Sequence, residues 1–251
     1  MKTCLLITLM ICLALPGGMA ADGLPPAGED TALTDAYFDD AVFVGDSVLK
    51  QLARYRMEQQ QRGRPLLGEA RFLSAAKYTL YAASLNGTTK KVRLRFQGRD
   101  VTLVEGLRLM EAGKVFVMLG LNDHAGNRLE VDIARYGRTI DNVREALPGI
   151  TFVALSITPV ARSGQSKTLT QRNLDAFNQA LEALCQEKGV AFLNLAPHLK
   201  DDRGYLNLDY SNDKWVHLND KGLQTVVEAL RSFAREQQAQ AAVQAQEDGR
   251  P

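Results

Sequence analysis

A serine occupies the kind of turn where a side chain can serve as a nucleophile. The apolar run Ala41–Val44 has the length of a strand, Gly45-Asp46-Ser47 follows it, and a helical pattern runs from Val48 to about Gln60. A serine on such a turn has its hydroxyl lifted above the sheet, and free N–H groups at the helix N-terminus favour a developing oxyanion. The same residues also form an ordinary helix cap, in which Ser47 only satisfies a backbone donor.

An asparagine follows a second apolar run of strand length. Val115–Leu119 is continued by Gly120-Leu121-Asn122-Asp123. An Asn at the carboxyl end of a neighbouring strand can direct its side-chain N–H to the same point as the Ser47 backbone N–H. The alternative is a loop in which Asn122 and Asp123 only make Asx turns.

A histidine stands just before the last helical segment. His217 lies in Asn212–Asn219, and Asp213 precedes it by four residues. An imidazole can take the proton of a serine hydroxyl, and a carboxylate can orient the imidazole and stabilise its cation. A histidine in this position can also be purely structural. Trp215 and Val216, beside it, either line an acyl pocket or pack in the core.

Strands and helices alternate along the chain in a way that can bring these segments together. The expected strands are 41–44, 70–74, 115–119, 150–155 and 190–195, with a hairpin over 92–103; the expected helices are 48–60, 107–112, 129–147, 170–188 and 218–238. This alternation predicts a mainly parallel sheet covered on both faces. In such sheets the ligand site lies beyond the carboxyl ends of the strands, where Ser47 and Asn122 are found.

The first residues have the layout of a cleaved export signal. Lys2 precedes the apolar run Leu5–Leu15, and small residues follow Pro16. An uncleaved anchor is the alternative, but the run is short for a membrane span, which needs about 20 residues. We therefore expect a signal peptide at 1–20, a flexible lead-in at 21–34, one domain at 35–238 and a polar tail at 239–251. The mature protein is expected outside the cytoplasm, secreted or in the periplasm or cell envelope, with no stable membrane insertion.

Charge and cysteine content exclude several kinds of partner and site. Lys2 is the only charged residue of the predicted signal, so 29 basic and 29 acidic residues remain. A neutral chain lacks the basic surface of a nucleic-acid binder. Cys4 and Cys12 leave with the signal, so Cys185 cannot form an internal disulfide. Its helical, apolar surroundings predict a buried thiol; a reactive thiol is the alternative.

The three blocks together resemble the SGNH (GDSL-type) hydrolases. Gly45-Asp46-Ser47, Gly120-Leu121-Asn122-Asp123, and Asp213 with His217 occur in the order of that family's first, third and fifth blocks. The resemblance covers roughly residues 40–235. It implies a three-layer α/β/α sandwich with a five-stranded, flavodoxin-like sheet, and neither metal nor cofactor.

The resemblance also implies a role for each residue. Ser47 is the nucleophile and lends its backbone N–H to an oxyanion hole, to which Asn122 adds its side-chain amide. His217 is the general base and Asp213 orients it. Asp46, Gly120 and Asp123 support these residues within their blocks.

This chain departs from the family pattern at two places. The acid usually lies three residues before the histidine, but Lys214 is there, so either the turn holds one more residue or the site is a Ser–His dyad. The second block usually provides a Gly whose backbone N–H completes the oxyanion hole. Here Ala75 follows the expected strand, and Gly87 is the other candidate.

The sequence therefore predicts an exported serine esterase that works through an acyl-enzyme on Ser47. The expected substrates are small-molecule or glycan esters, with O-acetyl groups on glycans or cell-wall polymers preferred by analogy with the family. Two alternatives remain: acyl transfer to a sugar hydroxyl, and a non-catalytic carbohydrate-binding domain on the same fold.

Overall fold

The centre of the protein is a sheet of five parallel strands. The structure is a computed structural model that describes residues 29–85, 93–123 and 128–247. The strands occur in the order β2-β1-β5-β6-β7, and all neighbours run parallel. Their bounds are β1 Ala41–Gly45, β2 Arg71–Ser74, β5 Lys114–Met118, β6 Thr151–Leu155 and β7 Ala191–Leu193. Each of the five predicted sheet strands is thereby confirmed, with its ends shifted by one or two residues.

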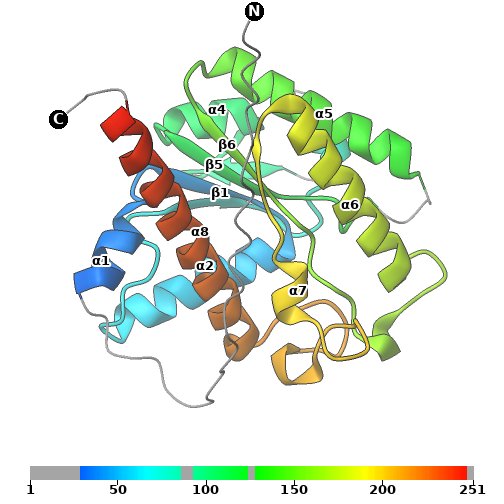
Figure 1. Cartoon of the computed structure of the whole chain (residues 1–251). Coiled ribbons are helices and arrows are strands. Elements are labelled where there is room, and N and C mark those ends of the chain that lie inside the picture. The colour runs from blue at the N-terminus through cyan, green and yellow to red at the C-terminus, as the bar shows by residue number, and fades with distance from the viewer. Residues whose placement is uncertain (1–28, 86–92, 124–127, 248–251) are drawn as a thin grey trace, which may run out of the picture.

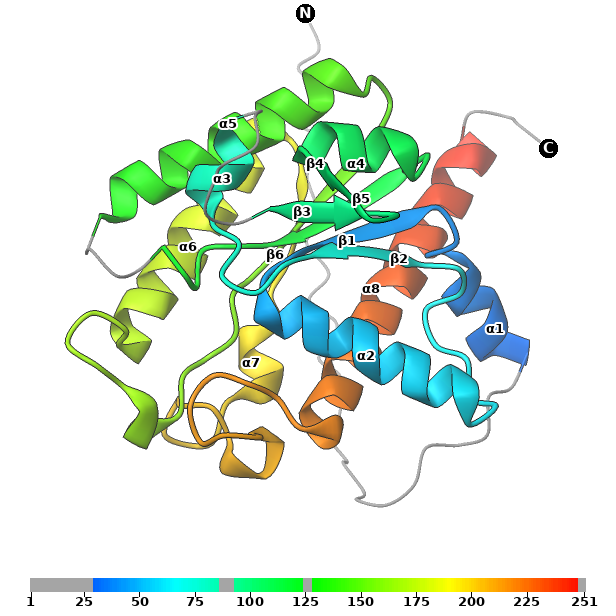
Figure 2. The same cartoon turned by 180° about the vertical axis from the view of Figure 1, so that it is seen from behind.

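Helices cover both faces of this sheet (Figures 1 and 2). One face packs against α4 (Leu103–Leu109), α5 (Leu129–Ala146) and α6 (Gln171–Lys188). The other face packs against α2 (Ser47–Gln61), α7 (Ala196–Leu199) and α8 (Asp220–Glu247). The predicted three-layer α/β/α sandwich is confirmed.

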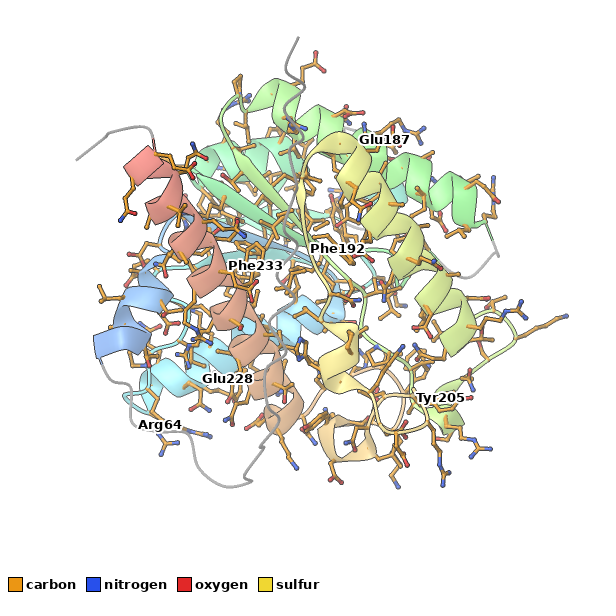
Figure 3. The ribbon with its side chains drawn as sticks, in the orientation of Figure 1. Arg64, Glu187, Phe192, Tyr205, Glu228 and Phe233 are labelled. Atoms are coloured by element: carbon orange, nitrogen blue, oxygen red, sulfur yellow. The ribbon has the colours of Figure 1, made fainter. Side chains whose placement is uncertain are left out.

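Alternation along the strands divides the core between the two faces. Val42 and Val44 of β1 belong to the core under α4, α5 and α6, whereas Phe43 belongs to the core under α2 and α8. Successive side chains of a strand point to opposite faces, so one strand supplies both layers. Phe233 of α8 is buried on the Phe43 side, with its ring centroid 6.1 Å from that of Phe116 (Figure 3).

Both ends of the domain contain more helix than the sequence predicts. The helix α1 (Glu29–Ala36) occupies part of the segment 21–34 that was expected to be a flexible lead-in. At the other end, α8 continues to Glu247 through most of the predicted tail 239–251. The Gln- and Ala-rich composition of that tail is compatible with helix, because both residues have high helix propensity. The predicted signal peptide lies outside the described residues.

The smaller elements lie at the periphery of the sheet. The predicted hairpin is present as β3 (Leu94–Phe96) and β4 (Arg99–Val101), which pair antiparallel. The short helix α3 (Leu80–Ser84) and the 3₁₀ turns η2 (Arg162–Gly164) and η3 (Leu208–Tyr210) were not predicted. Cys185 is buried as expected, and burial raises the pKa of its thiol to about 12. Among the described helices, none is both long and apolar enough to cross a membrane.

Candidate active site

Ser47 is the first residue of α2, at the carboxyl end of β1. The side chain of Asp46 caps the helix by accepting a hydrogen bond from the Val48 N–H at 3.0 Å. Asp46, rather than Ser47, therefore satisfies the helix donor. The Ser47 hydroxyl is left to face the carboxyl edge of the sheet, and its backbone N–H belongs to the first turn, where N–H groups have no partner within the helix.

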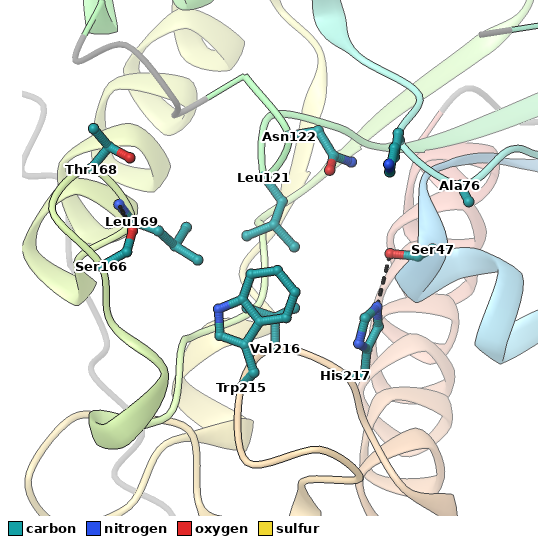
Figure 4. A pocket seen from close by; sticks show the side chains of 11 residues that line it. Ser47, Ala76, Leu121, Asn122, Ser166, Thr168, Leu169, Trp215, Val216 and His217 are labelled. Carbon is teal, nitrogen blue, oxygen red and sulfur yellow. Dashed lines mark hydrogen bonds between the residues drawn. The ribbon is translucent and has the colours of Figure 1, made fainter.

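The imidazole of His217 joins Ser47 to Asp213. His217 Nε2 lies 3.1 Å from Ser47 Oγ (Figure 4). On the other side of the ring, His217 Nδ1 lies 2.5 Å from Asp213 Oδ2. Both distances are within hydrogen-bond reach, so a proton can pass from the hydroxyl to the imidazole while the carboxylate holds the ring. The three side chains that the sequence analysis proposed as nucleophile, base and acid are therefore hydrogen-bonded in that order.

Residues 211–217, here called the acid–base loop, explain how an acid four residues upstream reaches the base. Lys214 adopts φ +57°, which turns the backbone between Asp213 and His217. Asp213 Oδ1 accepts the Trp215 N–H at 2.8 Å and the His217 N–H at 3.2 Å, which leaves Oδ2 free for the ring. The structure thus favours the longer turn over the Ser–His dyad.

The carboxylate of Asp213 is held in its charged form. Partial burial alone would raise its pKa, but hydrogen bonds from the His217 ring and from the Trp215 and His217 N–H groups outweigh burial and lower it. An ionised Asp213 stabilises the imidazolium that forms when His217 takes a proton.

Asn122 lies on the turn after β5, beside Asp46 and Ser47. Its amide Nδ2 donates to Asp46 Oδ2 at 3.0 Å and to the Tyr78 carbonyl at 3.3 Å. Gly120, with φ +126°, lets the chain turn sharply into this position. Burial raises the pKa of Asp46 to about 6, against the lowering effect of the Val48 N–H. Asn122 is therefore fixed by a buried carboxyl group that is ionised near neutral pH.

Asp123 supports the site from the other side of the same turn. Its carboxylate accepts the Leu80 N–H at 2.9 Å and the Tyr81 N–H at 3.3 Å, at the start of α3. Burial raises the pKa of Asp123 to about 6. The turn after β5 is thereby attached to the segment that follows β2.

Ala75 does not fit the expected role in the oxyanion hole. Its backbone N–H donates to the Gly45 carbonyl at 3.2 Å and so continues the pairing of β2 with β1. The next residue, Ala76, lines the cavity beside Ser47, and its N–H has no acceptor among the described residues. Ala76 replaces Ala75 as the candidate donor. The other candidate, Gly87, lies outside the described residues.

A cavity of about 550 Å³ opens beside Ser47, and its lining is mostly apolar (Figure 4). This apolar pocket is lined by Ser47, Ala76, Lys77, Leu121, Asn122, Ser166, Thr168, Leu169, Trp215, Val216 and His217. Val216 is buried, Trp215 is half-exposed, and both line the pocket. Lining the pocket therefore holds for both residues, and packing in the core holds as well for Val216.

The sequence did not single out the pocket residues Lys77, Ser166, Thr168 and Leu169. Segment 166–169 lies between β6 and α6, and so beyond the carboxyl end of β6. Because ligand sites lie beyond the carboxyl ends of parallel strands, this segment could have been predicted as part of the site. Lys77 adopts φ +63°, which is rare for a residue with a side chain, and its sequence gives no signal for this.

Comparison with known families agrees with this geometry. The model of the GDSL-like lipase/acylhydrolase family matches residues 43–225, which include Ser47, Asn122, Asp213 and His217. The chain belongs to this family. It is an ester hydrolase of the SGNH/GDSL type, and the alternative of a non-catalytic binding domain is set aside.

Solved structures show the same fold as this GDSL hydrolase at low sequence identity. A GDSL-like lipase from Bacteroides thetaiotaomicron is 15% identical, with a TM-score of 0.59 over 82% of this chain and 95% of that one. A carbohydrate esterase of family 3 from Talaromyces cellulolyticus is 17% identical, with a TM-score of 0.54 over 78% and 96%. An acetyl xylan esterase is 14% identical, with a TM-score of 0.56 over 77% and 98%. No curated protein matches the chain.

Within the described part of the hydrolase, no group of three or more His, Cys, Asp or Glu side chains could hold a metal ion. The groups that meet at this site are the hydroxyl of Ser47, the imidazole of His217 and the carboxylate of Asp213.

Proposed function

We propose that this chain is an extracytoplasmic hydrolase of carboxylic esters that works through an acyl-enzyme on Ser47. The observation that supports it most directly is the hydrogen-bonded series Ser47 Oγ, His217 Nε2, His217 Nδ1 and Asp213 Oδ2, with contacts of 3.1 and 2.5 Å. Its location outside the cytoplasm rests on the layout of residues 1–20.

The proposed reaction has two halves that share one base. Ser47 Oγ attacks the ester carbonyl while His217 Nε2 takes the hydroxyl proton, and the resulting tetrahedral intermediate bears an oxyanion. His217 then returns the proton to the departing alcohol, and the acyl group remains on Ser47. Water attacks this acyl-enzyme with the same base, and the carboxylic acid leaves.

Three donors around Ser47 are proposed to hold the oxyanion. They are the backbone N–H groups of Ser47 and Ala76 and the side-chain amide of Asn122. Asn122 Nδ2 already contacts the Tyr78 carbonyl at 3.3 Å, the longer of its two hydrogen bonds. We propose that this contact is exchanged for the substrate oxygen, while the bond to Asp46 keeps the amide in place.

The apolar pocket favours an acyl group of several carbons. An acetyl group would leave most of its 550 Å³ empty. Burial of each methylene group contributes about 0.8 kcal/mol, which is about fourfold in kcat/KM if the transition state gains it. The competing candidate is an acetyl group, which the sequence led us to expect. It is supported by the fold that this chain shares with an acetyl xylan esterase.

Hydrolysis of p-nitrophenyl acetate, butanoate and hexanoate by the wild type and by Ser47→Ala tests both parts of this proposal. We expect kcat/KM to rise by about fourfold per methylene group from acetate to hexanoate, and Ser47→Ala to lose at least about 10³-fold on every ester. Equal rates for the wild type and Ser47→Ala would refute the acyl-enzyme on Ser47. A maximum at acetate would refute the longer acyl group and leave the acyl-enzyme intact.

A further inference from the structure

A second hollow borders the same Ser47–His217 pair. It has a volume of about 490 Å³ and shares Ser47 and His217 with the apolar pocket. Its other walls include Lys50 and Arg54 of α2 and Asn212 and Asp213 of the acid–base loop. We call this hollow the alcohol-side groove. The Ser47–His217 pair therefore lies between two hollows, and Lys50, Arg54 and Asp213 line only the second one.

The position of the base assigns the two hollows to the two parts of an ester. The departing oxygen must lie next to His217 Nε2, because it receives its proton from that atom. The groove is bounded by the imidazole and by the acid that orients it, whereas the candidate oxyanion donors Ala76 and Asn122 line the apolar pocket. With the carbonyl oxygen on those donors, the acyl group occupies the apolar pocket and the alcohol occupies the groove. This assignment rests on the proposed function.

The groove carries an excess of positive charge. Lys50 and Arg54 lie four residues apart and so on the same face of α2. Arg54 contacts Glu58 at 3.7 Å, and within the described chain no carboxylate pairs with Lys50. The one acid that borders the groove, Asp213, directs its oxygens to His217 and to backbone N–H groups. Two exposed cations therefore line the groove without an equal number of free anions.

We propose that the alcohol part of the natural substrate bears a negative charge, a phosphate or a carboxylate, which Lys50 and Arg54 bind in the alcohol-side groove. A guanidinium donates in a planar fork that matches either anion, and the ammonium adds a point charge. The N-terminus of α2, at the same end of the groove, adds a partial positive charge.

Two matched pairs of esters test this proposal and separate the two anions. The first pair is the hexanoyl ester of glycerol 3-phosphate against that of glycerol, and the second is the hexanoyl ester of glucuronic acid against that of methyl glucuronate. We expect the wild type to hydrolyse the charged member of at least one pair with the higher kcat/KM. The pair with the larger ratio identifies phosphate or carboxylate as the preferred anion.

Variants of α2 identify the residues responsible. We expect the charged-to-neutral ratio of kcat/KM to fall by up to about fivefold in Lys50→Gln and again in Arg54→Gln. Added salt should lower the wild-type ratio, because these charges are exposed. The matched control is Arg64→Gln, which removes a charge from an exposed residue just beyond α2 that does not line the groove, at the edge of the molecule (Figure 3). It should leave the ratio unchanged.

A charged-to-neutral ratio of kcat/KM of one or less for both pairs in the wild type would overturn the proposal. The proposal would also fail if Lys50→Gln and Arg54→Gln left this ratio unchanged. An anion preference of equal size for p-nitrophenyl hydrogen succinate, which bears its charge on the acyl part, would overturn the assignment of the groove to the alcohol. Hydrolysis of p-nitrophenyl hexanoate by each variant shows separately whether the proposed function holds.

Discussion

At the scale of single residues, Asp46 links the helix that carries the nucleophile to the amide of the proposed oxyanion hole. One of its oxygens accepts the Val48 N–H and the other accepts Asn122 Nδ2. It is 1% exposed, and burial raises its pKa to about 6. Proton uptake below that pH removes the negative charge and places a hydrogen on a carboxyl group that accepts from two donors, so its hydrogen bonds to them weaken.

This coupling predicts a steep loss of activity at acid pH. As the pH falls through about 6, Asp46 takes up a proton, and its hold on Asn122 weakens. Asp46→Asn cannot titrate at this position, so log kcat/KM should fall with a steeper slope in the wild type than in Asp46→Asn as the pH passes through this range. At higher pH the plateau of Asp46→Asn should lie up to about 10²-fold lower than that of the wild type, because Asn122 is less well held. Equal slopes in the two proteins would contradict this role of Asp46.

The residues of the site differ in how far the sequence could identify them. Ser47, Asn122, Asp213 and His217 were identified because their residue types are uncommon in combination and each follows a predicted strand or precedes a helix. The candidate donor after β2 moves by one residue, from Ala75 to Ala76, because the Ala75 N–H is already used within the sheet. A backbone N–H has no residue type to mark it, and the last hydrogen bond of a strand, here Ala75 to Gly45, cannot be counted from the sequence.

At the scale of elements, the acid–base loop is held in place by the 3₁₀ turn η2. The Ala161 N–H donates to the Trp215 carbonyl at 2.8 Å, and Gly164 lies against the same residue. A Cβ atom added at Gly164 would lie 2.8 Å from the Trp215 Cα and 3.1 Å from the Lys214 carbonyl oxygen. The loop that positions Asp213 and His217 thus approaches η2 as closely as a glycine allows.

We therefore expect Gly164→Ala to impair catalysis from outside the reacting groups. Displacement of the acid–base loop by a few tenths of an ångström lengthens the His217–Ser47 contact, and kcat/KM on p-nitrophenyl hexanoate should fall by about tenfold or more. Gly137→Ala is the control: it adds the same methyl group in the middle of α5, where the closest atom is the flexible Lys188 Cε at 3.2 Å. An unchanged kcat/KM for Gly164→Ala would show that the loop does not need this close approach.

Elements with strong periodicity were predictable, and short or terminal ones were not. The five sheet strands and the long helices α5 and α6 have clear apolar patterns, so the sequence placed them within one or two residues. The helices α1, α3 and α7 have between 4 and 8 residues, too few for a helical period to be recognised. Tertiary contacts decide such segments: Asp123, 43 residues away from Leu80, accepts the Leu80 N–H in the first turn of α3.

At the scale of the whole molecule, an ion pair joins the first helix to the last. Arg231 of α8 donates to both carboxylate oxygens of Asp35 of α1, at 2.8 and 2.7 Å. Both side chains are less than a tenth exposed. Hydrogen bonds to Asp35 raise the pKa of the Arg231 guanidinium, so the pair stays charged. This ion pair joins α1 to α8 on the Phe43 side of the sheet.

Removal of one partner should destabilise the domain strongly. Asp35→Asn leaves Arg231 with Glu228, at 3.2 Å, as its remaining carboxylate partner, and we expect the loss of two charged hydrogen bonds to lower the free energy of unfolding in urea by about 2 kcal/mol. Asp141→Asn is the matched control, because Asp141 pairs with Lys188 but is 58% exposed; its loss should cost less than about 1 kcal/mol. Equal losses in the two variants would contradict a special role for the buried pair.

Catalysis by this hydrolase is proposed to depend on Ser47 as the nucleophile, activated by His217. Labelling with a fluorophosphonate, followed by mass-spectrometric mapping of the modified peptide, tests it most directly. We predict one modified residue, Ser47, and a labelling rate that falls by at least about 10³-fold in His217→Ala. Modification of another serine, or labelling of Ser47→Ala at the wild-type rate, would contradict the account.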